Sequence, residues 1–124
     1  QIVYNRPNSS NITNDGTPQK VWGDWELARK MGIPLIQELR HDYNLDYNSM
    51  QMALLSHSDH HISTQGGNSA LAAYFGGQNI IYGVKGYEVK HKAYETFFPK
   101  LSGQKINHVE TYDDLIKKVK DYVN

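Results

Sequence analysis

The sequence predicts an α/β fold: a doubly wound, Rossmann-like parallel sheet of about five strands with helices on both faces. Short β-favouring runs alternate along the chain with segments whose apolar residues recur at helical spacing, which gives five rounds of strand and helix. The links between these segments are short. Short links from strand to helix to the next strand require parallel strands joined by right-handed crossovers.

Five short runs rich in β-branched or aromatic residues are bounded by turn-forming residues, a pattern typical of strands. Pro7 cuts off the first run, and the long polar loop Asn8–Pro18 follows it. The third run lies between Asp59 and Gly66, which predicts a buried strand. The strands expected are Gln1–Asn5, Ile33–Leu39, His60–Thr64, Asn79–Val84 and Ile106–Glu110.

The helices are predicted from apolar periodicity together with residues that start and stop helices. Gly32 ends the first helix, and Asp46 or Asn48 offers an N-cap to the second. Thr111 and Asp114 form a near-capping box at the start of the last. The helices expected are Val21–Met31, Met50–His57, Ser69–Phe75, Val89–Phe98 and a final one from Thr111 to Val123.

Length and charge limit the class of protein. The chain has 124 residues, 39% of them hydrophobic, which suits one domain with its own apolar core. Thirteen basic and thirteen acidic side chains give a formal net charge of zero, so no long-range field attracts nucleic acid or an anionic membrane. We expect residues 1–124 to form a single domain with no nucleic-acid partner.

The absence of Cys excludes a disulfide framework and a thiolate zinc site, and it fits a reducing compartment. No apolar run approaches the roughly 20 residues that a membrane span needs. The start Gln-Ile-Val-Tyr lacks the features of a signal peptide. We therefore expect a cytoplasmic location and no membrane span.

Ligands of open parallel sheets bind beyond the carboxyl ends of the strands, and the turn after the third predicted strand has an unusual composition there. Residues 63–69 read Ser-Thr-Gln-Gly-Gly-Asn-Ser. Without Cβ atoms, Gly66 and Gly67 let a ligand approach the backbone, and the N–H groups of the first helical turn favour an anion such as phosphate or diphosphate. A purely structural tight turn, with Asn68 or Ser69 as N-cap, explains the same residues, so both interpretations stay open.

The turn matches neither of two common nucleotide motifs. No Gly-Lys-Ser/Thr follows it, so it is not a Walker loop, and it is not the G-x-G-x-x-G dinucleotide fingerprint. Two neighbouring loops add candidates. Glu88 follows the fourth strand and could accept ribose hydroxyl protons, or it could be a solvated acid in a first helical turn. Arg6 follows the first strand and could hold a phosphate bidentately, or it could be an ordinary surface residue.

Other chemistries have less support. His57, His60 and His61, with Asp59 nearby, suggest a metal site, but side chains of successive strand residues point to opposite faces. We therefore expect no metal. No serine lies in a nucleophile elbow, so hydrolase chemistry is not indicated.

A family resemblance extends these predictions. The run from Leu54 to Ser69, Leu-Leu-Ser-His-Ser-Asp-His-His-Ile-Ser-Thr-Gln-Gly-Gly-Asn-Ser, resembles the donor-nucleotide half of GT-B glycosyltransferases of bacterial polysaccharide type. The similarity continues through Ala-Ala-Tyr-Phe-Gly-Gly at 72–77 and Asn-Ile-Ile-Tyr at 79–82, and it ends near Glu88. The chain departs from the family where Leu71-Ala72-Ala73 replaces the usual Glu-Ala pair, and it has no second domain.

The resemblance implies a nucleotide-sugar-binding domain that is a fragment or one subunit of a larger enzyme. It implies that the turn residues hold the diphosphate: Gln65, Gly66, Gly67, Asn68 and Ser69. Glu88 would hold the ribose, Tyr82–Lys85 would lie near the base, and Arg6, Lys85 or Arg40 would add positive charge. The donor nucleotide sugar is the ligand, and no metal or other cofactor is expected.

On this interpretation a missing N-terminal acceptor domain or partner subunit completes the transferase, and the catalytic residues stay unknown. The alternative is a flavodoxin-like phosphate- or ligand-binding or regulatory module without catalysis, which would use the same turn.

Overall fold

The computed structural model describes residues 1–6 and 23–123, which divide into two compact units, Gln1–Leu54 and Leu55–Asn124. We call them the first and second units. The predicted loop Asn8–Pro18 and the first residues of the helix predicted from Val21 lie outside the described residues. Each unit has its own hydrophobic cluster, and the prediction that residues 1–124 form one domain stays a prediction.

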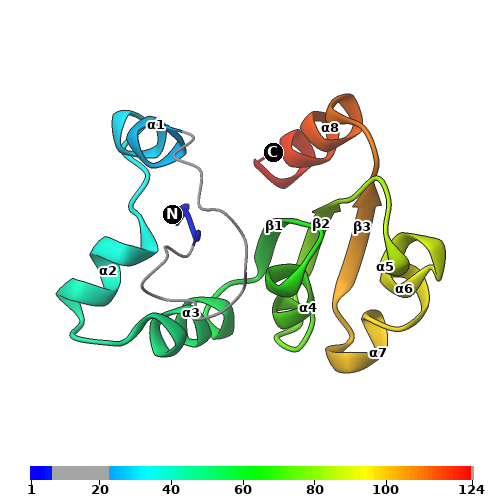
Figure 1. The fold of residues 1–124 in the computed structure, drawn as a ribbon, viewed down its shortest axis with the longest axis horizontal. Coiled ribbons are helices and arrows are strands. Elements are labelled where there is room, and N and C mark those ends of the chain that lie inside the picture. Colours follow the sequence, from blue (N-terminus) through cyan, green and yellow to red (C-terminus); the bar gives the residue numbers. More distant parts are fainter. Residues whose placement is uncertain (7–22, 124) are drawn as a thin grey trace. The chain divides into compact units, whose positions relative to one another are not determined.

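The first unit consists of α1 (Asp24–Lys30), α2 (Ile36–Asp42) and α3 (Tyr47–Ser56), which runs across the boundary between the units (Figure 1). Two of these helices were predicted. The N-cap prediction for α3 is confirmed for Asp46, whose Oδ1 accepts a hydrogen bond from the Ser49 amide at 2.9 Å. The core of this unit consists of Ile36, Tyr47 and Met50, with Leu39 and Leu54 packed against them.

The predicted strand Ile33–Leu39 is wrong, because most of its residues form α2. The Glu38 carboxylate accepts a hydrogen bond from the Leu35 amide at 3.3 Å and so caps the helix start. The predicted strand Gln1–Asn5 is reduced to one parallel bridge between Tyr4 and Leu35. Side-chain capping and good helix formers outweigh the β-favouring residues in this segment.

The second unit holds a parallel three-stranded sheet in the order β1 (His60–Thr64), β2 (Gln78–Tyr82) and β3 (Lys105–Val109). These strands match the last three predicted strands to within two residues at each end. The described residues therefore form one sheet of three strands, not about five. The two predicted strands that do not join this sheet are Gln1–Asn5 and Ile33–Leu39 of the first unit.

Helices cover both faces of this sheet (Figure 1). The five helices of the second unit are α4 (Gly67–Ala72), α5 (Tyr87–Lys90), α6 (Ala93–Thr96), α7 (Pro99–Ser102) and α8 (Tyr112–Val123). Helices α4 to α7 pack on the face that carries Ile81 and Ile106. Helix α8 packs on the opposite face, where its Tyr112 and Tyr122 contact the rings of Tyr82 and His60.

The hydrophobic cluster of the second unit lies between the sheet and α4 to α7. It consists of Ala73, Ile81, Tyr94 and Phe98, with Ala70, Val89, Ala93, Leu101 and Ile106 packed against it. No helix within the described residues is long and apolar enough to cross a membrane.

Strand β1 is an edge strand, and the prediction that it is buried is wrong. His61 is buried, but Ile62 is 56% exposed and His60 and Thr64 are exposed as well. The alternation arises because successive strand residues point to opposite faces. It also confirms that His60 and His61 face apart.

The predicted helix Val89–Phe98 is broken in two. Lys92 adopts a left-handed conformation with φ 52°, which ends α5 and starts α6 in a new direction. The Tyr94 and Phe98 rings then meet edge to face, with centroids 5.1 Å apart, in the core. Burial of these two rings favours the broken helix over a continuous one.

Two polar side chains fasten the turn that follows α4. Gln104 Nε2 is buried and donates to the carbonyls of Ala72 and Gly76 at 2.8 and 2.7 Å. The Ser102 hydroxyl accepts the Gly76 amide at 2.8 Å. These contacts satisfy groups that the end of a helix leaves without partners.

We expect Gln104→Ala to lower the free energy of unfolding by about 1–3 kcal/mol, because two carbonyls lose their donor in a buried place. Chemical denaturation measures the change. Lys100→Ala, at an exposed position of α7, is the control and should leave stability within about 0.5 kcal/mol. An equal effect of the two substitutions would contradict the proposed fastening by Gln104.

His61 should make stability depend on pH. Burial lowers its pKa below the ordinary value of 6.5, and the neighbouring His60 lowers it further against the opposing charge of Asp59. The unfolded chain therefore takes up the proton first, so this contribution is complete above about pH 6.5 and is lost as the pH falls. His61→Phe should reduce the loss of stability between about pH 7 and about pH 5, measured by denaturation. His60→Phe removes only the smaller contribution of the neighbouring charge, so it should reduce this loss less than His61→Phe does. Unchanged acid sensitivity in His61→Phe would refute the assignment.

Candidate ligand-binding site

The candidate site lies at the carboxyl edge of β1 and β2. These neighbouring parallel strands pair in register up to Thr64 and Tyr82. The pairing continues one residue further, because the Gln65 amide donates to the Tyr82 carbonyl at 2.8 Å. The loops that the sequence singled out after these two strands therefore start side by side.

The turn at Gly66 and Gly67 exposes its main chain. Gly66 has φ 137° and ψ −163°, a conformation that side chains with a Cβ rarely adopt. A Cβ built on either glycine would meet no atom within 4 Å. Gly66, Gly67 and Asn68 are all exposed, so a ligand has access to this stretch of backbone.

Ser69 has a different part in the turn from its exposed neighbours. It is 1% exposed, and its hydroxyl donates to the Gly66 carbonyl at 2.7 Å. This bond closes the turn just inside α4, which begins at Gly67. Ser69 therefore holds the shape of the turn, and its predicted contact with a ligand stays a prediction.

Gln65 connects the two loops. Its Nε2 donates to Glu88 Oε2 at 3.0 Å, across 23 residues of sequence. The Gln65 side chain lies over two glycines: a Cβ on Gly83 would come within 3.0 Å of Gln65 Oε1, and one on Gly86 would overlap Gln65 Nε2. A residue with a Cβ at either position would have to displace the end of the flexible Gln65 side chain.

A buried hydroxyl lies close to the same residues. Tyr94 Oη has no hydrogen-bond partner of good geometry in the part of the chain that the structure describes. Burial raises the pKa of Tyr94, and the Glu88 carboxylate raises it further, whereas the nearby Ser69 hydroxyl acts to lower it. The Tyr94 phenol therefore stays neutral at ordinary pH and close to both Ser69 and Glu88.

The predicted cations differ in where they lie. Lys85 is exposed in the loop after β2, on the way from Gly83 to Glu88. Arg6 belongs to the first unit, where its Nε lies 2.6 Å from Asp24 Oδ2 and its guanidinium is 5.1 Å from the centre of the Trp25 ring. Arg40, also in that unit, donates to Gln37 Oε1 at 3.1 Å. Phosphate binding by Arg6 or Arg40 stays a prediction.

The hydrogen-bond partners of Asp24 favour its ionised form. Burial acts to raise its pKa, but hydrogen bonds from Tyr4 and Arg6 outweigh it and hold the pKa below the ordinary value. The Tyr4 hydroxyl donates to Asp24 Oδ2 at 2.8 Å. The Arg6–Asp24 pair therefore fastens the start of the chain to α1.

Two further features lie away from this edge. An open hollow of about 350 Å³ is lined by first-unit residues Arg40, His41, Asn44, Leu45 and Asp46. Within residues 1–6 and 23–123, no three His, Cys, Asp or Glu side chains form a group that could hold a metal ion. The expectation that no metal takes part is not tested by this finding.

Sequence reasoning included Gly83 only within the range Tyr82–Lys85, and it gave no role to Gly86, to Tyr94 or to His108, whose ring contacts the Gly83 carbonyl oxygen. The two glycines carry a visible signal, since Gly-Val-Lys-Gly directly after a strand marks a loop that approaches something closely. Tyr94 and His108 carry none, because an aromatic residue in a helix and a histidine in a strand are ordinary core residues.

Comparisons with protein-family models, with curated proteins and with solved structures found no match for this chain. The site is therefore interpreted from its own geometry.

We expect Gly86→Ala to destabilise the second unit by about 1–3 kcal/mol, because backbone strain at φ 121° is joined by displacement of the Gln65 side chain from Glu88. Gly66→Ala is the matched control: its φ of 137° gives similar strain, but the added Cβ meets open space. A double-mutant cycle by chemical denaturation separates the two effects. In a Gln65→Ala background, the effect of Gly86→Ala should fall to that of Gly66→Ala, and an unchanged effect would refute the contact.

Proposed function

We propose that the second unit is the nucleotide-sugar (donor) binding domain of a glycosyltransferase, with the diphosphate held at the Gln65–Ser69 turn. The observation that carries the proposal is the 3.0 Å hydrogen bond between Gln65 and Glu88. It unites the two loops singled out in the sequence, at the edge where parallel sheets bind ligands. The resemblance of residues 54–88 to GT-B donor domains supports the same function.

The diphosphate would lie against exposed main chain. Gly66 and Gly67 allow close approach, and the exposed Lys85 ammonium can reach toward the same edge. Donors fixed in position stabilise the negative charge that develops on a leaving diphosphate, so catalysis by this domain would be electrostatic.

The ribose would be held by Glu88. Gln65 takes one of its two carboxylate oxygens, and Oε1 has no hydrogen-bond partner among the described residues. A carboxylate oxygen accepts hydrogen bonds from hydroxyl groups, and a ribose offers two adjacent ones. Gln65 would then act as a positioning residue that orients Glu88.

Sugar transfer itself needs an acceptor site and a catalytic base, which this proposal assigns to another domain or subunit. A cytoplasmic location belongs to the same proposal. The second unit by itself would bind the donor nucleotide without transferring the sugar.

We expect isothermal titration calorimetry to detect binding of at least one of uridine, guanosine and cytidine diphosphate. Glu88→Gln should weaken that binding about tenfold, the effect of losing a hydrogen bond to a charged group. Glu110→Gln removes another exposed carboxylate, after β3, and should leave affinity unchanged.

Two results would contradict the proposal. One is the absence of heat with all three diphosphates at about 1 mM, the affinity limit of a weak site. The other is equal affinity of Glu88→Gln and wild type. A yellow purified protein that binds none of the diphosphates would favour the flavodoxin-like alternative.

A further inference from the structure

We propose that His108 is a positioning residue whose protonation clamps the loop Gly83–Glu88, so that affinity at the neighbouring Gln65–Ser69 turn depends on pH. The effect on affinity rests on the proposed function. The clamp itself rests only on the contacts of the ring and can be tested without a ligand.

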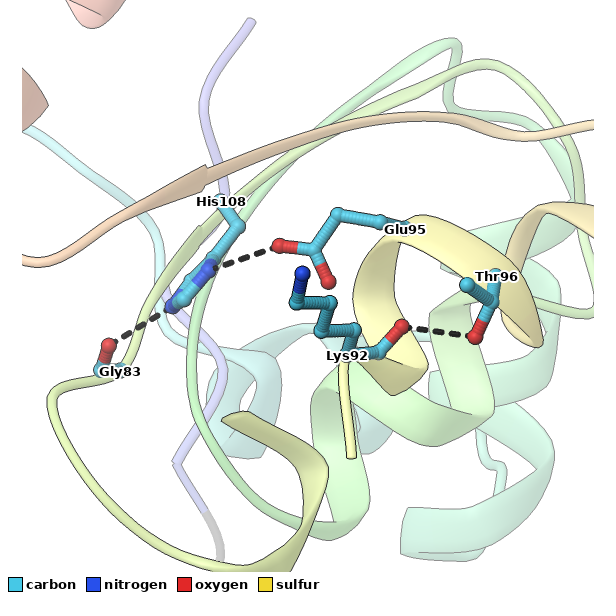
Figure 2. A network of polar contacts seen from close by, with 5 residues as sticks. All are labelled: Gly83, Lys92, Glu95, Thr96 and His108. Carbon is cyan, nitrogen blue, oxygen red and sulfur yellow. Dashed lines mark hydrogen bonds and ion pairs between the residues drawn. The ribbon is translucent and has the colours of Figure 1, made fainter. Parts of the chain in front are cut away.

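The two ring nitrogens of His108 face two oxygens on different elements (Figure 2). Nε2 lies 2.7 Å from the Gly83 carbonyl oxygen, directly after β2. Nδ1 lies 3.2 Å from Glu95 Oε1 on α6. His108 itself is on β3, and its side chain is 10% exposed.

Both partners are hydrogen-bond acceptors, which favours the protonated form of the His108 ring. A carbonyl and a carboxylate oxygen only accept hydrogen bonds, so each contact needs an N–H on the histidine. A neutral imidazole has one N–H and must leave one oxygen without a donor. Only the imidazolium form makes both bonds, and its bond to Glu95 is also an ion pair.

The charged groups around the ring come from α5 and α6. From α5, the Glu88 carboxylate acts on Tyr94, the ring that packs against His108. From α6, Glu95 supplies the anion, and Lys92, the N-cap residue of that helix, supplies a cation (Figure 2). The neutral Tyr94 ring packs against His108 with centroids 5.0 Å apart. Gly83 contributes only its main chain. Glu95 is therefore the charged group in direct contact with the ring.

The loop end that His108 holds leads directly to the candidate site. The Gly83 amide donates to the Val109 carbonyl at 3.1 Å, while the Gly83 carbonyl accepts from His108. The Gln65 side chain lies against the same glycine, on the side where a Cβ would be, and it donates a hydrogen bond to Glu88. A shift of Gly83 therefore displaces the residue that orients Glu88.

Loss of the proton should loosen this arrangement. The ring then divides between two forms, one bonded to Gly83 and one bonded to Glu95. In the second form the Gly83 carbonyl has lost its donor, and Gly83 keeps the hydrogen bond from its amide to the Val109 carbonyl. The clamp should therefore weaken as the pH rises and His108 loses its proton.

The first experiment uses no ligand. NMR of the ring nitrogens follows the protonation of His108, and amide hydrogen exchange, corrected for intrinsic rates, gives the protection factor of the Gly83 amide, which donates to the Val109 carbonyl. We expect protection to fall about threefold as His108 loses its proton, the change that matches one modest hydrogen bond. His108→Gln keeps a donor near the Nε2 position without titrating, so its protection should not change with pH.

His108→Leu removes both bonds and should give low protection at every pH. Protection at Ile80, which is fully buried in β2, tests whether each variant is folded. Loop protection that does not change as His108 titrates, or a ring that stays in the Nε2–H neutral form throughout, would overturn the clamp.

The second experiment measures uridine diphosphate affinity by calorimetry for wild type and His108→Gln at the same series of pH values. The ratio of the two affinities cancels the titration of the nucleotide. We expect this ratio to fall about threefold from low to high pH. A constant ratio, with binding present, would overturn the control of affinity by His108. No binding at any pH would overturn the proposed function, and the loop measurements would still decide the clamp.

Glu95→Gln is the matched variant for the charge. It keeps an oxygen near Nδ1 but removes the ion pair, so the loss of protection should occur at lower pH than in wild type. An unshifted transition would show that the ion pair does not hold the proton on His108.

Discussion

The side chain of Gln65 is the contact on which the rest of the candidate site depends. Its main chain extends the pairing of β1 with β2 by one residue, and its side chain lies across Gly83 and Gly86 to reach Glu88. Without this contact, the loops after β1 and β2 would share an edge of the sheet but would have no defined spacing. The parallel strands bring the two loops to the same edge, and the Gln65 side chain fixes the distance between them.

The residues of the site are of two kinds: some fix the main chain by hydrogen bonds, and others are exposed and accessible to a ligand. Ser69 and His108 each make a hydrogen bond to a main-chain carbonyl, at Gly66 and Gly83, and neither is exposed. Gly66, Gly67, Asn68 and Lys85 are exposed around them. Exposed backbone keeps a fixed shape only when groups beneath it are bonded, which is the arrangement that a preorganised anion site requires.

Local patterns predicted the second unit well and the first unit less well. The runs His60–Thr64 and Ile106–Glu110 became β1 and β3 almost without change, because their residues favour an extended, paired backbone. Ile33–Leu39 became helical because Glu38 caps the chain at Leu35, which a strand pattern does not reveal. The left-handed Lys92 likewise follows from burying Tyr94 and Phe98, not from any local preference.

The sequence by itself determined that strands and helices alternate after residue 59, that a Gly-Gly turn follows the strand at Thr64, and that Glu88 lies one strand further along. Hydrophobic spacing and turn-forming residues act over a few positions, so such features can be read from neighbours in the chain. Only the tertiary structure decided that Gln65 meets Glu88, that Tyr94 lies close to the turn, and that His108 faces two acceptors. These contacts join residues 13 to 25 positions apart, and the packing of whole elements selects them.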